Sequence, residues 1–186
     1  ELIKNMNRVN KYMDKIMSSH EVVAYLMILM NYISAKELRK YKTGIYRTSK
    51  FNNTYKLPEE APKECQKFLK LCNSYGGKYV IFDEIEGHDW LELDAYVHMT
   101  SPIRRLVDLL NIIRIQDILK IGDISEEGKE FYKRWTTVEE MEYINNTMRS
   151  IRKVQNDCTL LEKCINDKDM LKRNHKGYIF DKIQRN

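Results

Sequence analysis

Two adjacent arginines, Arg104 and Arg105, follow Ser101-Pro102 and precede apolar residues at helical spacing. Ser101 is a residue type that caps helices and Pro102 suits a first turn, so the pattern predicts a helix over 102–121. Positive charges in the first turn oppose the helix dipole, which costs stability unless an anion binds nearby. A helix amino terminus, hydroxyl groups and two guanidinium groups together favour a phosphate group. The segment therefore predicts a phosphate-binding site.

Asp108 offers a second interpretation of the same arginines. It lies three residues after Arg105 and four after Arg104 on the predicted helix, at spacings where side chains face each other. An ion pair with either arginine would then serve the fold alone. We expect both interpretations to hold, with Arg105 paired to Asp108 and Arg104 facing a phosphate, whose oxygens a planar guanidinium binds in pairs.

Periodicity and turn residues predict the elements that position these side chains. The apolar stretch Val22–Ile33 is apolar on nearly all sides, which predicts a central buried helix, and Asn31 within it should bond neighbouring backbone. The predicted helices are 2–16, 20–41, 62–74, 102–121 and 126–171, the last broken near 136–137, and the predicted strands are 44–47, 79–82, 90–96 and 177–180.

Composition constrains the class of protein weakly. The 186 residues include 42% hydrophobic residues, enough for one domain with a core, and the net charge of +5 slightly favours anionic partners. The four cysteines have no zinc-binding spacing, so we expect reduced thiols in a cytoplasmic protein, with nucleus or organelle also open. The longest apolar run has about twelve residues, too short for a bilayer, so we expect no membrane partner.

The string from Tyr96 to Leu109 resembles the hallmark of the ribonuclease II/R (RNB) family, commonly Tyr-x-His-Phe-Thr-Ser-Pro-Ile-Arg-Arg-Tyr-x-Asp-Leu. His88 with the leucines after it resembles the family's His-Phe-Gly-Leu segment, and Tyr79 stands at the place of a family tyrosine. Segments 23–35 and 44–47 resemble a family helix and the strand after it. The resemblance covers about residues 18 to 180.

The resemblance implies an α/β (α+β) fold, mostly helical in this stretch, whose few strands belong to a sheet that an upstream half of the domain completes. It divides the chain into the C-terminal part of an RNB ribonuclease domain, 1–174, and the start of a following RNA-binding barrel or tail, 175–186. The implied partners are single-stranded RNA, the upstream half of the RNB domain and a larger protein complex.

The resemblance also implies a 3'→5' exoribonuclease, a hydrolase that degrades single-stranded RNA to nucleoside monophosphates. Its Mg²⁺ ions would be bound by aspartates outside this chain, because no cluster of aspartates at the family spacing occurs in it, and this chain alone should be inactive. The implied catalytic residue is Arg104, and the implied RNA-binding residues are Arg105, Thr100, Ser101, Arg47 and His98.

The chain departs from the family pattern where polar residues support the active site. Ala24 and Tyr25 replace paired glutamates, Ile112 and Ile113 replace a His-Arg pair, Leu106 replaces a tyrosine, and Gln155-Asn156 replaces a glutamate. A catalytically inactive, RNB-derived RNA-binding or scaffold subunit of a larger complex is therefore an alternative. A third hypothesis is a helical interaction module without nucleic-acid affinity.

Overall fold

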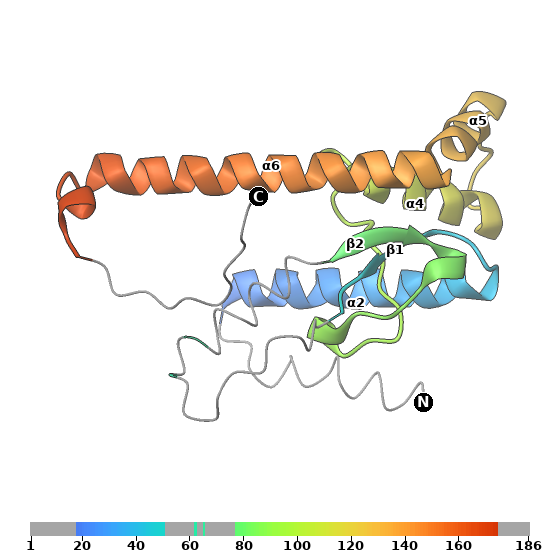
Figure 1. Cartoon of the computed structure of the whole chain (residues 1–186). Helices are drawn as coiled ribbons and strands as arrows, with labels where there is room; N and C mark the ends of the chain where they lie inside the picture. Colours follow the sequence, from blue (N-terminus) through green and yellow to red (C-terminus); the bar gives the residue numbers. More distant parts are fainter. Residues whose placement is uncertain (1–17, 51–61, 63–64, 66–76, 175–186) are drawn as a thin grey trace.

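The computed structural model describes residues 18–50, 62, 65 and 77–174. Figure 1 shows two long helices, α2 and α6, with the small sheet between them and α4 and α5 near the amino-terminal end of α6. The described elements are α2 (Ser19–Lys40), β1 (Ile45–Thr48), β2 (Lys78–Ile81), η2 (Phe82–Glu84), η3 (Asp89–Leu91), α4 (Leu106–Leu119), α5 (Glu126–Trp135), α6 (Val138–Asn166) and η4 (Met170–Lys172).

Most predicted elements are confirmed, and the fold is α+β and mostly helical. The break near 136–137 is confirmed, because Thr137 caps α6 by accepting a hydrogen bond from the Glu140 N–H. The predicted helix 2–16, most of the predicted helix 62–74 and the predicted strand 177–180 lie outside the described residues. The division at 174/175 stays a prediction.

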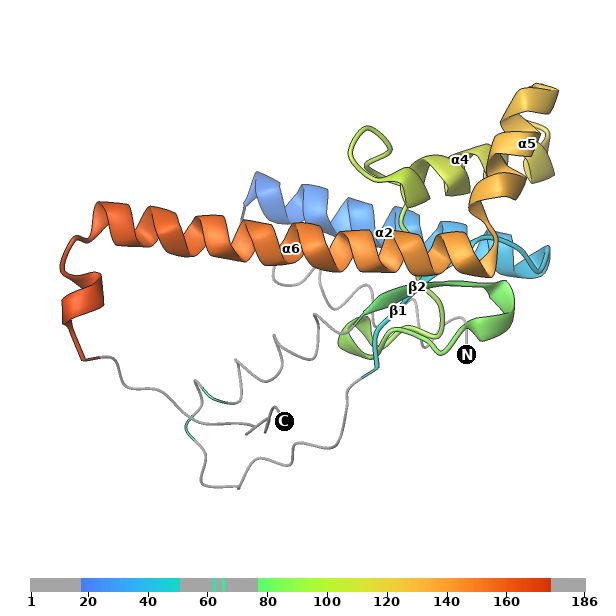
Figure 2. The same ribbon diagram turned by 45° about the horizontal axis from the view of Figure 1, so that its top comes forward.

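Strands β1 and β2 pair antiparallel, with Tyr46 opposite Val80 and Arg47 opposite Tyr79. Since side chains alternate across a sheet, Tyr46 and Val80 face one side and Arg47 and Tyr79 face the other. Tyr46 and Val80 pack with Ala35 of α2, whereas Tyr79 packs in a cluster with residues of α4 and α6. The two sides of the sheet therefore pack against α2 and against α6, while α4 contacts α2 as well, through Ile115 and Ile118. In the turned view of Figure 2, α4 and α5 lie on one side of α6 and the two strands on the other.

The predicted strand 90–96 is wrong. The chain forms the turn η3 there, and the backbone of His88 exchanges hydrogen bonds with that of Leu93. Glu92 has φ = 54°, in the left-handed region, which ends any extended run. Leu93 and Ala95 are buried, so the alternation in the sequence comes from a folded loop with an inward side rather than from a strand.

Three asparagine amides tie the helices to the strands and loops. Asn111 of α4 accepts from the Ile45 N–H and donates to the carbonyls of Ile45 and His98. Asn145 of α6 accepts from the Tyr79 N–H at 2.7 Å and donates to its carbonyl at 2.8 Å. Asn31 of α2 accepts from the Met99 N–H, as predicted, and donates to a tyrosine hydroxyl.

Helix α2 is buried on one face only, which corrects the prediction of a fully buried helix. Tyr25, Tyr32 and Leu38 are buried, whereas a second apolar stripe is 41–56% exposed: Val22, Val23, Leu26, Met30 and Ile33. The sequence pattern does not distinguish a face covered by the described residues from one that they leave open. Among the helices that the structure describes, none has the length and apolar character needed to cross a membrane.

The first prediction concerns Asn111, which is 0% exposed. Replacement by alanine leaves the N–H and carbonyl of Ile45 buried without this partner, and we expect Asn111→Ala to lower the free energy of unfolding by about 3 kcal/mol. Urea unfolding followed by circular dichroism measures this change. The matched control is Asn146→Ala, an exposed asparagine on α6. A loss no larger than that of the control would contradict the proposed tie.

Candidate functional site

Arg105 and Asp108 form a fixed ion pair at the start of α4. The Arg105 Nη2 donates to Asp108 Oδ2 at 2.8 Å, and its Nε lies 2.7 Å from Oδ1. The Asp108 side chain is 0% exposed and that of Arg105 15%. The predicted ion pair is confirmed, and it places the positive charge of Arg105 at the edge of the core with a carboxylate to balance it.

The predicted start of the α4 helix at 102 is wrong. The N–H groups of Arg104 and Arg105 donate to the Ser101 carbonyl, so residues 101–105 form a turn, and the helix begins at Leu106 after an extended Arg105. The Ser101 hydroxyl does not cap. Instead, Asp108 Oδ2 accepts from the Ser101 N–H at 2.8 Å and holds the turn against the helix.

The turn leaves Arg104 exposed, outside the helix. Among the described residues, no carboxylate lies within ion-pair distance of its guanidinium group. Arg104 and Arg105 border a cavity of about 190 Å³, whose other walls include Tyr79 and, from α6, Tyr143 and Met148. Arg104 is therefore available to an external anion, whereas Arg105 is held by Asp108.

Arg47 lies on the same side of the sheet as the cavity. Its guanidinium carbon is 5.0 Å from the centre of the Tyr79 ring. A Cβ atom at Gly77 would come within 2.7 Å of Arg47 Nη2, so the guanidinium also lies close to the glycine backbone. Burial, followed by the positive charges of Arg152 and Arg105, lowers the pKa of Arg47. Arginine nevertheless stays charged in proteins, so this site holds a partly buried cation.

Two histidines and two tyrosines form an aromatic cluster beside the arginines. His98 Nδ1 lies 2.8 Å from the Tyr79 hydroxyl, and the His98 and His88 rings both pack edge-on against Tyr96. Burial and the charges of Arg105 and Arg47 lower the pKa of His98 to about 2. Burial, again with Arg47, lowers the pKa of His88 to about 4. Both rings are therefore neutral at pH 7 and serve as packing and hydrogen-bonding groups.

The structure brings the predicted site residues together from two segments. Arg47 comes from β1, and His98, Thr100, Ser101, Arg104 and Arg105 come from the loop before α4. The Thr100 hydroxyl oxygen is buried and has no hydrogen-bond partner among the described residues. The functional roles assigned to these residues stay predictions.

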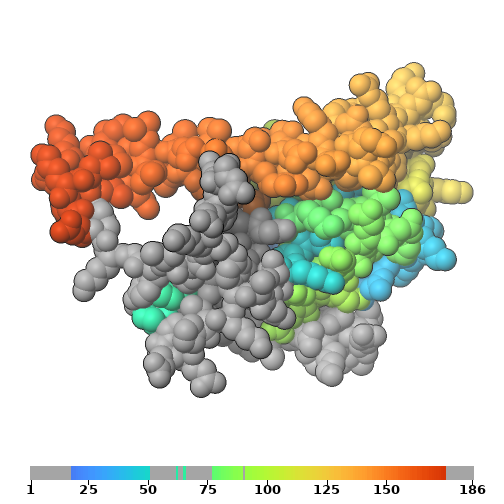
Figure 3. All heavy atoms as spheres, viewed as in Figure 1, coloured from blue at the N-terminus to red at the C-terminus, as the bar shows by residue number. Residues whose placement is uncertain are grey.

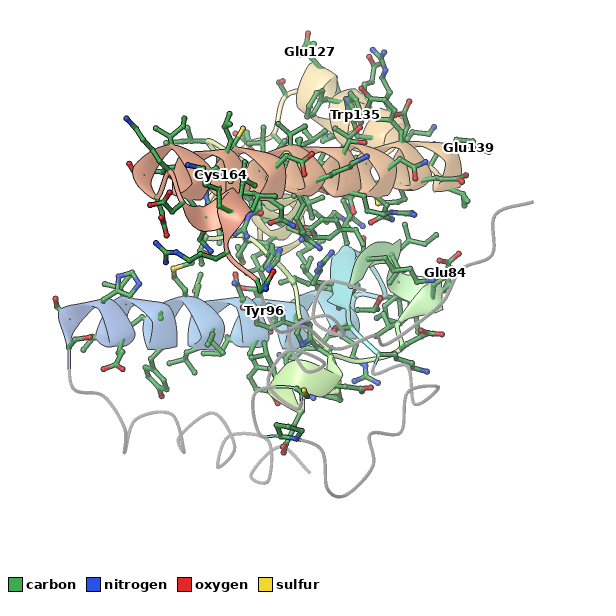
Figure 4. All side chains as sticks on the ribbon, turned by 60° about the vertical axis from the view of Figure 1, so that its left-hand side comes forward. Glu84, Tyr96, Glu127, Trp135, Glu139 and Cys164 are labelled. Carbon is green, nitrogen blue, oxygen red and sulfur yellow. The ribbon has the colours of Figure 1, made fainter. Side chains whose placement is uncertain are left out.

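The sequence did not predict the contacts that Tyr79 and Asn145 make in the site. The Tyr79 ring faces Arg47, its hydroxyl contacts His98, and its backbone is bound by Asn145. A local pattern could not reveal the last contact, because the two residues are 66 positions apart. An asparagine near the apolar face of a helix was the one signal available. Figure 4 shows Tyr96 of the aromatic cluster at the edge of α2 that faces α6.

The donor set around the arginines does not fit Mg²⁺. Magnesium prefers carboxylate and water oxygens in octahedral geometry. The carboxylate in this cluster, that of Asp108, is already bound to Arg105 and to the Ser101 N–H. Across the described ranges, no group of three or more His, Cys, Asp or Glu residues is placed to hold a metal ion.

The second prediction follows from the neutral histidines. A histidine whose pKa in the fold lies below its ordinary value of 6.5 binds fewer protons folded than unfolded. Its contribution to stability is therefore complete above pH 6.5 and is lost as the pH falls. Between pH 6.5 and 5 we expect the free energy of unfolding to fall by about 2 kcal/mol for each of His88 and His98.

Urea unfolding at pH 7.5, 6.5 and 5 measures this dependence. His98→Gln removes one titrating group and should reduce the loss by about half. The control is His20→Gln, whose side chain is exposed at the start of α2. A pH dependence that is the same in both variants would show that His98 is not the titrating group.

The sequence matches the RNB domain over residues 2–121. A search of curated proteins found no match. Two similar solved structures are Mycoplasma genitalium RNase R in complex with double-stranded RNA (TM-score 0.56, 16% identity) and with ribose-methylated single-stranded RNA (TM-score 0.57, 17% identity).

The matched part is 76% and 81% of this chain, respectively, and 31% and 29% of the RNase R chains, so the chain spans about three tenths of their length. At these identities the two structures show the fold. The match of the RNB domain covers more than half of the 186 residues. The chain therefore belongs to the RNB domain family.

Proposed function

We propose that the protein is a 3'→5' exoribonuclease that hydrolyses single-stranded RNA to nucleoside monophosphates. This chain supplies the arginines that bind the scissile phosphate, and the aspartates that bind Mg²⁺ lie outside it, so that this chain alone is inactive. The observation that carries the proposal is the difference between the two arginines. Arg105 is neutralised by Asp108, whereas Arg104 is exposed with no carboxylate beside it among the described residues.

The chemistry of Arg104 suits negative charge that develops on a phosphate. Its planar guanidinium donates two parallel hydrogen bonds to phosphate oxygens. The turn over 101–105 is fixed by the Ser101–Asp108 hydrogen bond, so the guanidinium starts from an ordered backbone. A positioned cation of this kind stabilises a transition state more than a bound substrate when charge increases during the reaction.

The neighbouring residues support binding of the RNA chain rather than of particular bases. Arg47 supplies positive charge and Arg105 a guanidinium group paired to Asp108, while Ser101 and His98 supply hydroxyl and imidazole groups beside the buried Thr100. Contacts of this kind with the sugar-phosphate backbone of RNA do not depend on base sequence. The two RNase R structures contain RNA, one double-stranded and one single-stranded, which supports RNA as the ligand class here.

The alternative function is a catalytically inactive, RNB-derived RNA-binding or scaffold subunit of a larger complex. Tyr25, at a position of the family's paired glutamates, is 8% exposed and packs in a cluster with Tyr32, Leu93 and Tyr96. An apolar cluster has replaced a carboxylate at that position. Gln155 and Asn156, where the family has a glutamate, are exposed on α6 and carry no charge. These replacements favour a protein that binds RNA without cleaving it.

The third prediction separates turnover from binding. In the full-length protein, we expect Arg104→Ala to lower the rate of shortening of a 5'-labelled single-stranded RNA by about a hundredfold. Its affinity for the same RNA, measured in chelator, should fall only severalfold, because the interaction strengthens in the transition state. The control is Arg134→Ala, an exposed arginine on α5 outside the cluster.

Equal losses of turnover and affinity would argue against a role in the transition state and favour a binding role for Arg104. If the wild-type protein binds the RNA but produces no shortened products with Mg²⁺ present, the inactive RNA-binding subunit is the correct function. If it neither binds nor shortens the RNA, the exoribonuclease and the RNA-binding subunit are both excluded, and the scaffold subunit remains.

A further inference from the structure

Arg152 on α6 lies on the helix face that contacts the sheet. It follows Asn145 by seven residues, which is two turns, so the two side chains share a face about 10 Å apart along the axis. Asn145 binds the Tyr79 backbone. Ile151, next to Arg152, borders the same cavity as Arg104 and Arg105. The helix therefore carries Arg152 along the side of the sheet that Arg47 and Tyr79 face.

The electrostatics place Arg152 near Arg47 and Tyr79. Burial raises the pKa of the Tyr79 hydroxyl, and the positive charges of Arg47, Arg105 and Arg152 each oppose that rise. Arg152 and Arg105 also lower the pKa of Arg47, after its burial. One tyrosine, Tyr79, therefore lies near the positive charges of three arginines, which come from β1, from the loop before α4, and from α6.

The charges of these arginines are unequally balanced. Asp108 neutralises Arg105 through two close contacts. Arg47 meets the face of Tyr79, and no carboxylate of the described residues lies within ion-pair distance of it. Like charges held together at a partly buried place repel each other, which costs stability unless an anion joins them. A phosphate group, with several acceptor oxygens, can receive hydrogen bonds from two guanidinium groups at once.

Arg152 also lines a groove along α6. The groove has a volume of about 340 Å³ and is lined by Arg149, Arg152 and Lys153, with Asn156 and Asp157 one turn further on. Figure 3 shows α6 along one edge of the molecule, with its carboxyl-terminal half extending well beyond β1 and β2. Three cations against one carboxylate make this groove a path for a polyanion.

We propose that Arg47 and Arg152 together bind a second phosphate of the RNA, next to the phosphate bound by Arg104, so that the site holds two successive phosphates of one strand. This inference rests on the proposed RNA-binding function. It assigns to Arg152 a role in holding polynucleotides in preference to mononucleotides, because a mononucleotide has no second phosphate to place there.

The fourth prediction tests Arg152 by the salt dependence of binding. The full-length protein is titrated with fluorescein-labelled twelve-residue oligouridylate in chelator, by fluorescence anisotropy, at several salt concentrations. We expect Arg152→Ala to weaken binding about tenfold and to reduce the slope of log K against log salt by about 0.7, the value for one phosphate contact on a single strand. Competition with uridine 5'-monophosphate should be unchanged in Arg152→Ala and weakened in Arg104→Ala.

Two further variants serve as controls for this measurement. Arg152→Lys retains the charge and should retain most of the slope, which a purely structural role of the guanidinium would not predict. Arg134→Ala on α5 is the matched arginine control and should change neither quantity. If Arg152→Ala does not fold, as judged by circular dichroism, Arg152→Gln replaces it, because glutamine keeps the aliphatic stem.

The outcomes separate this inference from the proposed function. If wild type binds oligouridylate and Arg104→Ala weakens binding, but Arg152→Ala changes neither the affinity nor the slope, the second phosphate site is overturned and the proposed function stands. Equal weakening of oligouridylate and uridine 5'-monophosphate by Arg152→Ala also overturns it. If wild type binds no oligouridylate, the proposed function fails and the second phosphate site fails with it.

Discussion

The buried carboxylate of Asp108 is the constraint on which the site depends. It is 0% exposed, holds the guanidinium of Arg105 and accepts from the N–H of Ser101. A buried carboxylate without such partners would be very unfavourable, so the pair and the turn form together or not at all. By fixing Arg105 inward, it also determines that the preceding arginine is directed outward. One carboxylate thereby gives two neighbouring arginines different roles.

The asparagine ties extend this order to the rest of the molecule. The sheet has only two described strands, too few for independent stability. Asn111 and Asn145 supply the hydrogen bonds that a third and fourth strand would otherwise make, one from α4 and one from α6. Each amide offers both a donor and an acceptor, so it can satisfy the N–H and the carbonyl of one residue. The helices therefore fix the strands directly.

The sequence predicts well what depends on local pattern. Periodicity and capping residues predict α2, β1, β2, and the break between α5 and α6, although α6 ends at Asn166 rather than at 171. Helical spacing predicts the Arg105–Asp108 pair. The predicted start of α4 was wrong because Asp108 accepts from the Ser101 N–H and holds residues 101–105 in a turn, so that Ser101 does not cap the helix. The alternation at 90–96 came from a folded loop, which buries Leu93 and Ala95 but also Tyr96, on the side predicted to be polar. The Tyr79–Asn145 contact joins residues 66 positions apart, and its one local signal is an asparagine near the apolar face of a helix.

Gly77 is a position where a substitution should leave the fold intact and alter the site. The atoms that a side chain at this position would displace belong to the guanidinium of Arg47 and not to the backbone. A long arginine side chain can move aside at little cost, so the fold would accept an alanine there. The displaced guanidinium would then leave the face of Tyr79. In a library of random variants, Gly77 should therefore belong to a small class of positions where abundance of the protein is retained and ligand affinity is lost.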